Sequence, residues 1–238
     1  MAKYFIFNGV NSQEYGINLE SYTVGTPAKK KVEVEIPYRH GSLDFSTFFT
    51  GENTYKNRTI TVKFNIVCKS EAELKVKYNK ITQWLIDTPG KVDLLFSDAR
   101  GYIFKAEVES SISYEEFYNA GSFTVNFTAE PFRQSVDYQG HLITWDNFNF
   151  LEDVLSNAKW ELSTTQKVVH YTSSRKTTPV IKVSKGSVKL TNNGYTTPLL
   201  GVGEHIDYNF YLVNDKNDIT ITTSTTSIVE LIYKKEAL

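Results

Sequence analysis

The sequence contains a single cysteine, Cys68, and its only methionine is the initiator. A lone cysteine cannot form an internal disulfide bond, which excludes a small secreted scaffold held together by disulfides. No apolar run is long enough to span a bilayer, and residues 1–4 lead into short aromatic positions rather than a secretory signal. We therefore expect a protein made inside the cell, with no membrane segment. The formal net charge of −1 argues against sequence-specific nucleic-acid binding, which needs a basic surface.

Motifs for catalysis, metal binding and cofactor binding are equally scarce. The four histidines stand in unrelated settings, without a nucleophile elbow or the close spacing of a metal site: His40, His141, His170 and His205. Residues 201–203 do not continue into a dinucleotide fingerprint. Residues 214–218 lack the later glutamate of a calcium loop, so we expect a polar hairpin turn there. The sequence therefore predicts no catalytic residue, no metal and no cofactor.

Aromatic residues make up 14% of the sequence, a composition that favours β-strands. Residues 59–68 give the clearest strand, whose inward side chains are Ile60, Val62, Phe64, Ile66 and Cys68. Residues 31–36 alternate in the same way. We expect them to form a half-buried strand that directs Val32, Val34 and Ile36 inward and ends at Pro37. Further strands are expected at residues 4–7, 92–96, 102–108 and 122–129.

One helix is expected, at about residues 70–87. Apolar residues recur there at helical spacing, and the face that they form must be buried against a sheet. These residues are Leu74, Tyr78, Ile81 and Leu85. Ser70 is a suitable N-cap and Glu73 stands three residues later, which predicts a capping box. Pro89 ends the helix because it lacks a backbone N–H.

The segment at about residues 37–56 has no regular period, although it is rich in aromatic residues. So many rings are not expected to stay in solvent. Two interpretations remain open: the segment folds back on its own domain, or it forms an arm that packs on a neighbouring subunit. The rings concerned are Tyr38, Phe45, Phe48, Phe49 and Tyr55.

The second half of the chain is expected to be a separate domain. Pro131 interrupts the strand pattern, and we place the boundary just after it, which gives domains at residues 1–135 and 136–238. Short strands with turns between them are typical of a β-sandwich. They are expected at residues 160–162, 166–171, 180–183, 187–191, 204–212, 219–222 and 228–233. Asn193-Gly194 favours a type I′ hairpin.

A sandwich of this kind leaves two further functions open. The first is a free carbohydrate-binding or adhesin module, for which Trp145, Trp160 and Tyr195 are candidate sugar-stacking residues. Large aromatic side chains also fill sandwich cores, which is the competing interpretation. The second is a glycosidase with Glu115-Glu116 as its carboxylates, although adjacent acids lie on opposite sides of a strand.

Three segments of the sequence resemble the distal tail proteins of long, non-contractile-tailed phages that infect Gram-positive bacteria. The segment Phe7-Asn8-Gly9-Val10-Asn11-Ser12, with Tyr15-Gly16-Ile17 after it, is similar to the N-terminal signature of that family. The segment Arg39-His40-Gly41-Ser42-Leu43-Asp44, followed by Gly51 and Tyr55, resembles its arm. The segment Ala129-Glu130-Pro131-Phe132 resembles the end of its N-terminal domain. The resemblance covers roughly the first 135 residues.

This resemblance implies a mainly β chain. It would consist of an N-terminal β-sandwich with one α-helix and an extended arm, followed by a C-terminal galectin-like β-sandwich. It also implies a structural hub without catalysis, assembled in the bacterial host cytoplasm into a homohexameric ring at the tail tip. DNA would pass through the ring, and the arm of each subunit would lie on the next subunit. The arm residues implied in that contact are Arg39, Leu43, Phe45, Phe48, Phe49 and Tyr55.

The resemblance further implies a set of partners in the virion. These are the tail tube protein, the tape measure protein, the tail-associated tip protein, and receptor-binding or baseplate proteins that serve host attachment. Compared with larger relatives, the chain has no room for an inserted carbohydrate-binding module, so sugar binding is not implied.

Overall fold

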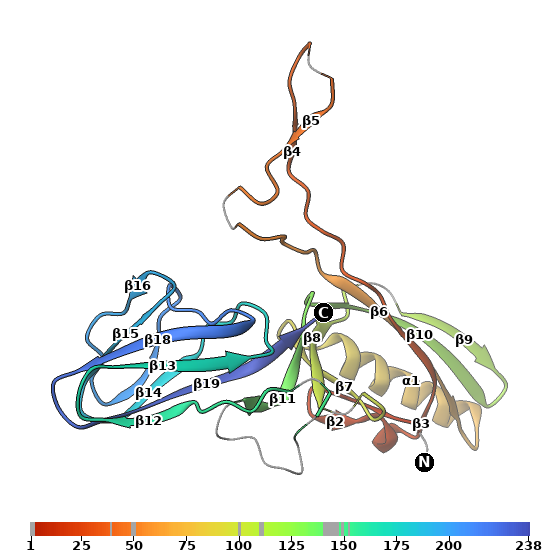
Figure 1. Ribbon diagram of the computed structural model, residues 1–238. Coiled ribbons are helices and arrows are strands. Elements are labelled where there is room, and N and C mark those ends of the chain that lie inside the picture. The colour runs from red at the N-terminus through yellow and green to blue at the C-terminus, as the bar shows by residue number, and fades with distance from the viewer. Residues whose placement is uncertain are drawn as a thin grey trace. The chain divides into compact units, whose positions relative to one another are not determined.

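The computed structural model describes residues 3–38, 40–48, 51–99, 101–109, 112–139, 148, 150–151 and 153–238 (Figure 1). The chain divides into two compact units, Met1–Arg133 together with Leu238, and Gln134–Ala237. Strands dominate both units, and the described residues contain one α-helix, so the predicted mainly β fold is confirmed. Arg39, Phe49 and Trp145, which the sequence singled out, lie outside the described residues.

The first unit contains an antiparallel sheet centred on one long strand. Its elements are β1 (Phe5–Phe7), β2 (Val10–Asn11), the 3-10 helix η1 (Ser12–Tyr15), β3 (Ile17–Val24), β4 (Glu33–Glu35), β5 (Ser42–Asp44), β6 (Arg58–Val67), α1 (Glu71–Ile86), β7 (Val92–Phe96), β8 (Tyr102–Glu107), β9 (Ser113–Phe117) and β10 (Ala120–Ala129). Strand β10 pairs with β6 along its whole length and with β9 and β8 on its other edge. Strand β6 continues the sheet to β3, and β8 continues through β7 to β1.

The helix α1 buries its predicted apolar face. Leu74, Ile81 and Leu85 are fully buried in the same core as the inward residues of β6 and β10. Tyr78 stacks on Phe123 of β10, with 5.9 Å between the ring centroids. A helix of this length is marginal alone in water, so this packing is what holds it in place.

The predicted capping box at the start of α1 is only half formed. The Ser70 hydroxyl accepts a hydrogen bond from the backbone N–H of Glu73 at 3.3 Å, as expected. The Glu73 carboxylate does not return to Ser70 but accepts from the N–H of Lys69 at 3.0 Å. This hydrogen bond is the main reason that the pKa of Glu73 is lowered. The carboxylate therefore satisfies a donor one residue before the expected one.

The predicted half-buried strand at residues 31–36 is wrong in its extent and surroundings. The strand β4 covers only Glu33–Glu35, and Val32, Val34 and Ile36 are exposed rather than inward. The alternation itself is real, but β4 pairs with β5 in a separate two-stranded sheet, and none of the described residues forms a second layer over it. Alternation shows that a strand has one apolar face, and it does not show what covers that face.

Two antiparallel sheets with a core between them form the second unit. Its strands are β11 (Arg133–Gln139, of which Arg133 belongs to the first unit), β12 (Lys159–Leu162), β13 (Gln166–Thr172), β14 (Val180–Lys185), β15 (Val188–Asn192), β16 (Tyr195–Thr196), β17 (Gly203–Ile206), β18 (Asp215–Thr223) and β19 (Ser227–Ala237). One sheet joins β12, β19, β14 and β17, and the other joins β13, β18, β15 and β16. At Asn193 and Gly194 φ is +50° and +77°, as the predicted type I′ hairpin requires.

Two predicted elements of the second unit are wrong. The strand expected at residues 204–212 ends at Ile206, because Asp207 caps a turn by accepting the N–H groups of Asn209 and Phe210, both at 3.0 Å. The polar turn expected at residues 214–218 is mostly strand, since β18 begins at Asp215. The buried side chain of Asn217 accepts from the N–H of Val213 at 2.8 Å and so closes the turn from within the strand.

Candidate assembly interface

A long hairpin leaves the first unit between β3 and β6 (Figure 1). Near its base, the backbone N–H of Lys30 donates to the carbonyl of Thr54 at 2.8 Å. Farther out, β4 and β5 pair in antiparallel register, with Val34 opposite Leu43. We call residues 26–57 the arm.

The register of the arm sorts its side chains onto two chemically different faces. Paired residues share a face, and successive residues along a strand alternate between faces. The apolar face consists of Val32, Val34, Ile36, Leu43 and Phe45. The charged face consists of Lys31, Glu33, Glu35, Ser42 and Asp44.

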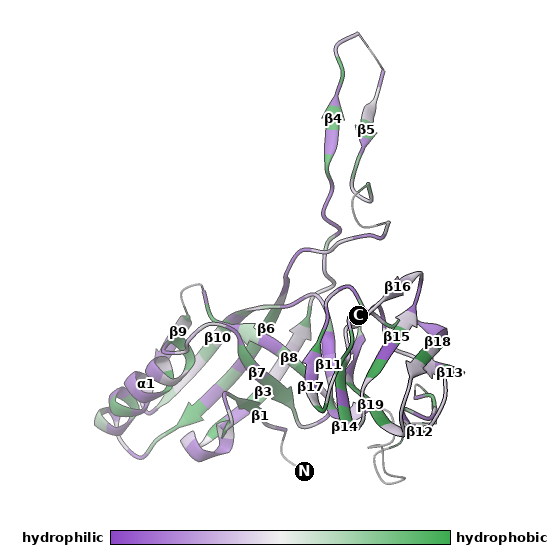
Figure 2. Cartoon of the chain, turned by 90° about the vertical axis from the view of Figure 1, so that its left-hand side faces the viewer, coloured by the Kyte–Doolittle hydropathy of each residue, from purple (hydrophilic) through white to green (hydrophobic). Residues whose placement is uncertain are grey.

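The apolar face is open to solvent in the single chain. The exposed fractions are 55% for Val32, 47% for Val34, 41% for Ile36 and 37% for Phe45. Hydrophobic and hydrophilic residues alternate along β4 (Figure 2). A contiguous group of exposed apolar side chains marks an interaction site, and a lone two-stranded hairpin is only marginally stable in water. The arm therefore has the chemistry of a segment that is buried against another molecule.

Polar contacts order part of the charged face. Lys31 forms an ion pair with Asp44, and the Ser42 hydroxyl donates to the Glu33 carboxylate at 3.2 Å. The pKa of Asp44 is lowered, first by the hydrogen bond from Lys31 and then by those from Ser46. Glu35 is different, because it is exposed and forms no hydrogen bond or ion pair with any residue that the structure describes.

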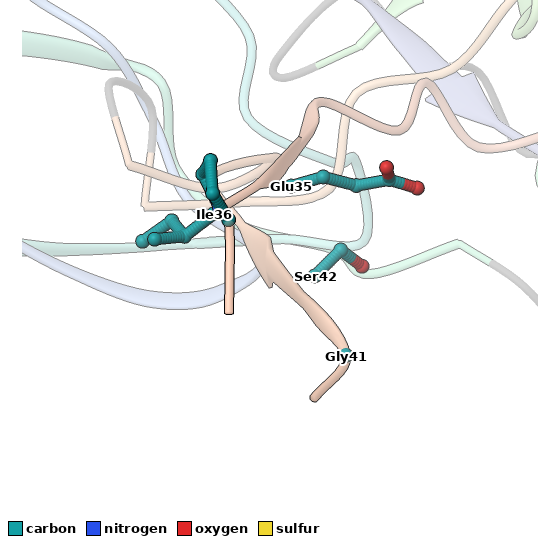
Figure 3. Close-up of a pocket in the computed structure, with 5 residues that line it drawn as sticks. Glu35, Ile36, Gly41 and Ser42 are labelled. Atoms are coloured by element: carbon teal, nitrogen blue, oxygen red, sulfur yellow. The ribbon is translucent and has the colours of Figure 1, made fainter. Parts of the chain in front are cut away.

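A hollow of about 470 Å³ lies at the distal end of the arm, lined by Glu35, Ile36, Pro37, Gly41 and Ser42. The Glu35 carboxylate and the Ser42 hydroxyl point to one side of the ribbon, and Ile36 points to the other (Figure 3). Next to the hollow, Tyr38 is fully exposed and has a φ of +65°, a conformation that a bulky residue rarely adopts. Strain of this kind concentrates at functional sites.

The described arm residues implied by the sequence resemblance lie in two settings. Leu43 and Phe45 belong to the apolar face, and Phe48 packs edge-on against Phe45 with 5.8 Å between ring centroids. Tyr55 lies at the base of the arm, where its ring meets Phe132 at 5.6 Å. Sequence reasoning missed the contribution of β4, which supplies Val32, Val34 and Ile36 to the apolar face. Their alternation is the sequence signal for this face, although on its own it predicts a half-buried strand.

Arginine and aromatic side chains meet at the base of the arm, around Arg58. This residue is only 6% exposed, donates through Nη2 to the carbonyl of Pro131 and lies over the Phe104 ring, 5.7 Å from its centroid. Its Nε is buried and has no partner among the described residues. The Arg133 guanidinium lies nearby, 4.1 Å from the centroid of the Tyr102 ring. The pKa of Arg58 is lowered, first by burial and then by the positive charge of Arg133.

Of the candidate sugar-stacking residues, Trp160 and Tyr195 belong to or pack against the core of the second unit. Trp160 is 8% exposed, so its ring does not present a face to solvent. Tyr195 packs against the same core, and its hydroxyl donates to the Asp207 carboxylate at 2.8 Å. Trp160 is therefore a core residue, which is the alternative to sugar stacking.

His170 is a fully buried histidine in the second unit. Its Nδ1 lies 2.9 Å from the carbonyl oxygen of Asn157, and its Nε2 lies 3.0 Å from the Tyr233 hydroxyl. Because Nδ1 faces a carbonyl, we assign the proton to Nδ1, and Nε2 then accepts from Tyr233. Burial lowers the pKa of His170 below its ordinary value of 6.5.

This pKa predicts that the second unit loses stability in acid. The unfolded chain binds a proton at His170 at higher pH than the folded chain does, so this contribution is fully present above about pH 6.5 and is lost as the pH falls below it. We expect His170→Gln to flatten the dependence of the free energy of unfolding on pH, measured by urea titration at about pH 7.5 and about pH 5.5. The control Thr164→Gln, at an exposed position of the same unit that carries no titratable group, should keep the native slope. An unchanged slope in His170→Gln would contradict the assignment.

Groups of side chains suited to metal binding were not found among the described residues, which contain no cluster of three or more His, Cys, Asp or Glu. In the same part of the chain, no helix has the length and apolar character needed to cross a membrane.

Comparison with known proteins defines the class of this chain. Residues 11–129, half of the chain, match the family described as phage tail protein RIFT-related domain. The chain belongs to this family and is a phage tail protein. Among solved structures, the Dit (gp 19.1) protein of phage SPP1 is similar, with a TM-score of 0.66 and 12% identity over 100% of both chains. That structure is described as a paradigm of the hub adsorption apparatus in Gram-positive-infecting phages.

These findings confirm the resemblance to distal tail proteins, at the level of a tail-protein family and of the fold. A comparison with curated proteins gives no match.

Proposed function

We propose that the chain is the hub of the phage tail tip, a homohexameric ring in which the arm of each subunit lies on its neighbour. The observation that carries this proposal is the exposed apolar face of the arm. A ring uses two different patches of each subunit, one that reaches out and one that receives, and a projecting arm is suited to the first role. The ring would join the tail tube protein above to the tail-associated tip protein below.

In this proposal, the first unit forms the ring, and the tape measure protein and DNA pass through its channel. The second unit would be a galectin-like sandwich to which receptor-binding or baseplate proteins attach. The domain division at about residue 135 is part of the same proposal. Support comes from the tail-protein family and from the fold shared with a protein described as a hub. The hub has no catalytic step, and its function is mechanical connection and host attachment.

The arm provides the direct test of this function. By light scattering after size exclusion, we expect the native chain to have the mass of six subunits of 27.2 kDa each, or of two stacked rings. The double variant Val34→Asn, Leu43→Asn should run as a monomer with native circular dichroism, because it makes the apolar face polar without touching the body of the unit. The control Glu33→Gln changes the charged face and should leave the oligomer largely intact.

Two results would contradict the proposal. One is a native chain that stays monomeric at high concentration, both alone and when mixed with the tail tube protein. The other is an unchanged oligomer mass in the double variant, which would show that the apolar face is not an assembly surface.

A further inference from the structure

The strand β17 of the second unit has one edge that is open. It pairs with β14 on one side and is the last strand of its sheet, so its other side pairs with no strand that the structure describes. An open edge presents a row of unpaired backbone N–H and C=O groups, and natural proteins usually protect it with lysine, proline or a covering segment. β17 contains neither lysine nor proline. Its edge can therefore accept a strand from another molecule.

Other outer strands of the second unit are protected. In the same sheet, β12 directs the charged side chains of Lys159 and Glu161 to solvent. In the second sheet, the Ser156 hydroxyl accepts the backbone N–H of Tyr171 at 2.9 Å and so covers part of the edge of β13. β17 differs from both of these strands.

Exposed apolar side chains gather at the open edge. Val202, Ile206 and Tyr208 lie in β17 or within two residues of it, and each is more than half exposed. Ile206 also ends an apolar row on the outer face of the sheet, because its cross-strand partner is Val180 and the partner of Val180 is Ile232. Exposed apolar groups of this kind mark interaction sites.

A second row on the same face alternates in charge. The strand register aligns four residues across β12, β19, β14 and β17, which are Lys159, Glu230, Lys182 and Glu204. The Lys182 ammonium lies 3.6 Å from the Glu204 carboxylate. The row ends on an acid at the open edge. Since opposite charges stabilise cross-strand neighbours, the next strand is expected to place a basic side chain beside Glu204.

We propose that β17 is the attachment site of the second unit, and that the receptor-binding or baseplate protein adds an extended strand to its open edge. That strand would place a lysine or arginine beside Glu204 and, two positions away, an apolar residue beside Ile206. This inference rests on the function proposed above for the second unit. A second copy of β17 would not supply the base, because residues 199–208 contain no lysine or arginine. Backbone hydrogen bonds would provide affinity, and the two side-chain positions would set the register.

Virions that carry single substitutions in this chain test the site. Glu204→Lys places a base against the expected base, and Ile206→Lys places a charge at the apolar position. We expect each variant to lower the amount of one tip protein per copy of tail tube protein at least about 10-fold, measured by quantitative mass spectrometry of purified virions. Glu161→Lys is the matched control, because it makes the same change at an exposed glutamate of β12, and it should change this amount less than about twofold.

Hydrogen exchange then separates strand addition from contact through side chains alone. The purified chain is mixed with the protein that the variant virions lack. We expect amides of β17 to exchange at least about 10-fold more slowly in the mixture, because an added strand pairs with the open edge. The protected segment of the added protein should contain a lysine or arginine two positions from an apolar residue.

The outcomes distinguish this inference from the function on which it rests. A native chain that never assembles, alone or with the tail tube protein, overturns both. Native rings with a full set of tip proteins in Glu204→Lys and Ile206→Lys virions overturn the edge site and leave the hub in place. Unchanged exchange of the β17 amides has the same meaning.

Two controls on the purified variants complete the test. A smaller oligomer mass in either variant would place a second copy at this edge and would overturn the proposed occupant. Circular dichroism checks the fold, and Ile206→Asn replaces Ile206→Lys if the lysine variant does not fold.

Discussion

Phe64→Ala is expected to lower the free energy of unfolding of the first unit by about 3–5 kcal/mol, the range for removing a large aromatic side chain from a core. Phe64 is fully buried, lies on β6, stacks on Phe123 with 4.8 Å between ring centroids, and also meets Phe5 at 5.9 Å. The alanine would leave a cavity bounded by two sheet strands and the helix, which cannot collapse without breaking the ladder between β6 and β10.

Native-state hydrogen exchange measures this loss separately for each unit, because the amides of the β6–β10 ladder report on the first unit alone. The control is Tyr118→Ala, at a turn position that is 91% exposed, where we expect a change within about 0.5 kcal/mol. Equal protection in the native chain and Phe64→Ala would show that these aromatic contacts do not hold the core together.

The second large effect is expected at Gly186, where an alanine should destabilise the second unit by about 2–4 kcal/mol. Its φ is +74°, and an added Cβ would lie 2.1 Å from the Ser227 hydroxyl oxygen and 2.8 Å from the carbonyl oxygen of Thr226. Ser227 is buried, and its hydroxyl bonds to the carbonyls of Ser187 and Thr225, so it cannot move aside cheaply.

Gly194 is a matched control for this substitution. Its φ is +77°, nearly the same, but nothing lies within 4 Å of an added Cβ. Gly194→Ala should therefore show only the conformational cost of a left-handed alanine, about 1 kcal/mol. The difference between the two variants in urea unfolding isolates the steric clash, and equal losses would mean that the backbone around Gly186 relaxes freely.

The body of the first unit could be predicted from the sequence because its local patterns agree with its tertiary packing. The side chains of β6 alternate without interruption, and the apolar side chains of α1 lie on one helical face. Each pattern therefore predicts one type of element and one buried face. Of the residues expected inward on both elements, all are buried except Tyr78, which is partly buried and packs against the same core.

The arm could be predicted only in part, because its alternating pattern does not identify its partner. The alternation of Val32, Val34 and Ile36 predicts a half-buried strand, because a period of two normally indicates a sheet with one face packed on its own core. In the structure the same residues face solvent on a ribbon. The pairing of β4 with β5 depends on a turn within the aromatic segment, and nothing local to residues 31–36 specifies it.

The second unit was less predictable because polar side chains take part in its interior. Asn217 is buried within β18, although its neighbours Lys216 and Asp218 read as an exposed turn. Buried polar residues satisfied by backbone groups leave no hydrophobic pattern to detect.

Cys68 follows β6 directly, is 5% exposed, and has no other cysteine in the sequence to compete with it. A reagent in solution reaches this thiol only when the core of the first unit opens, so the rate of thiol modification measures that opening. The native protein thus carries its own chemical reporter, usable in free subunits and in purified virions without any label or substitution. Comparing the two rates would show how far incorporation into the particle suppresses the opening of a single subunit.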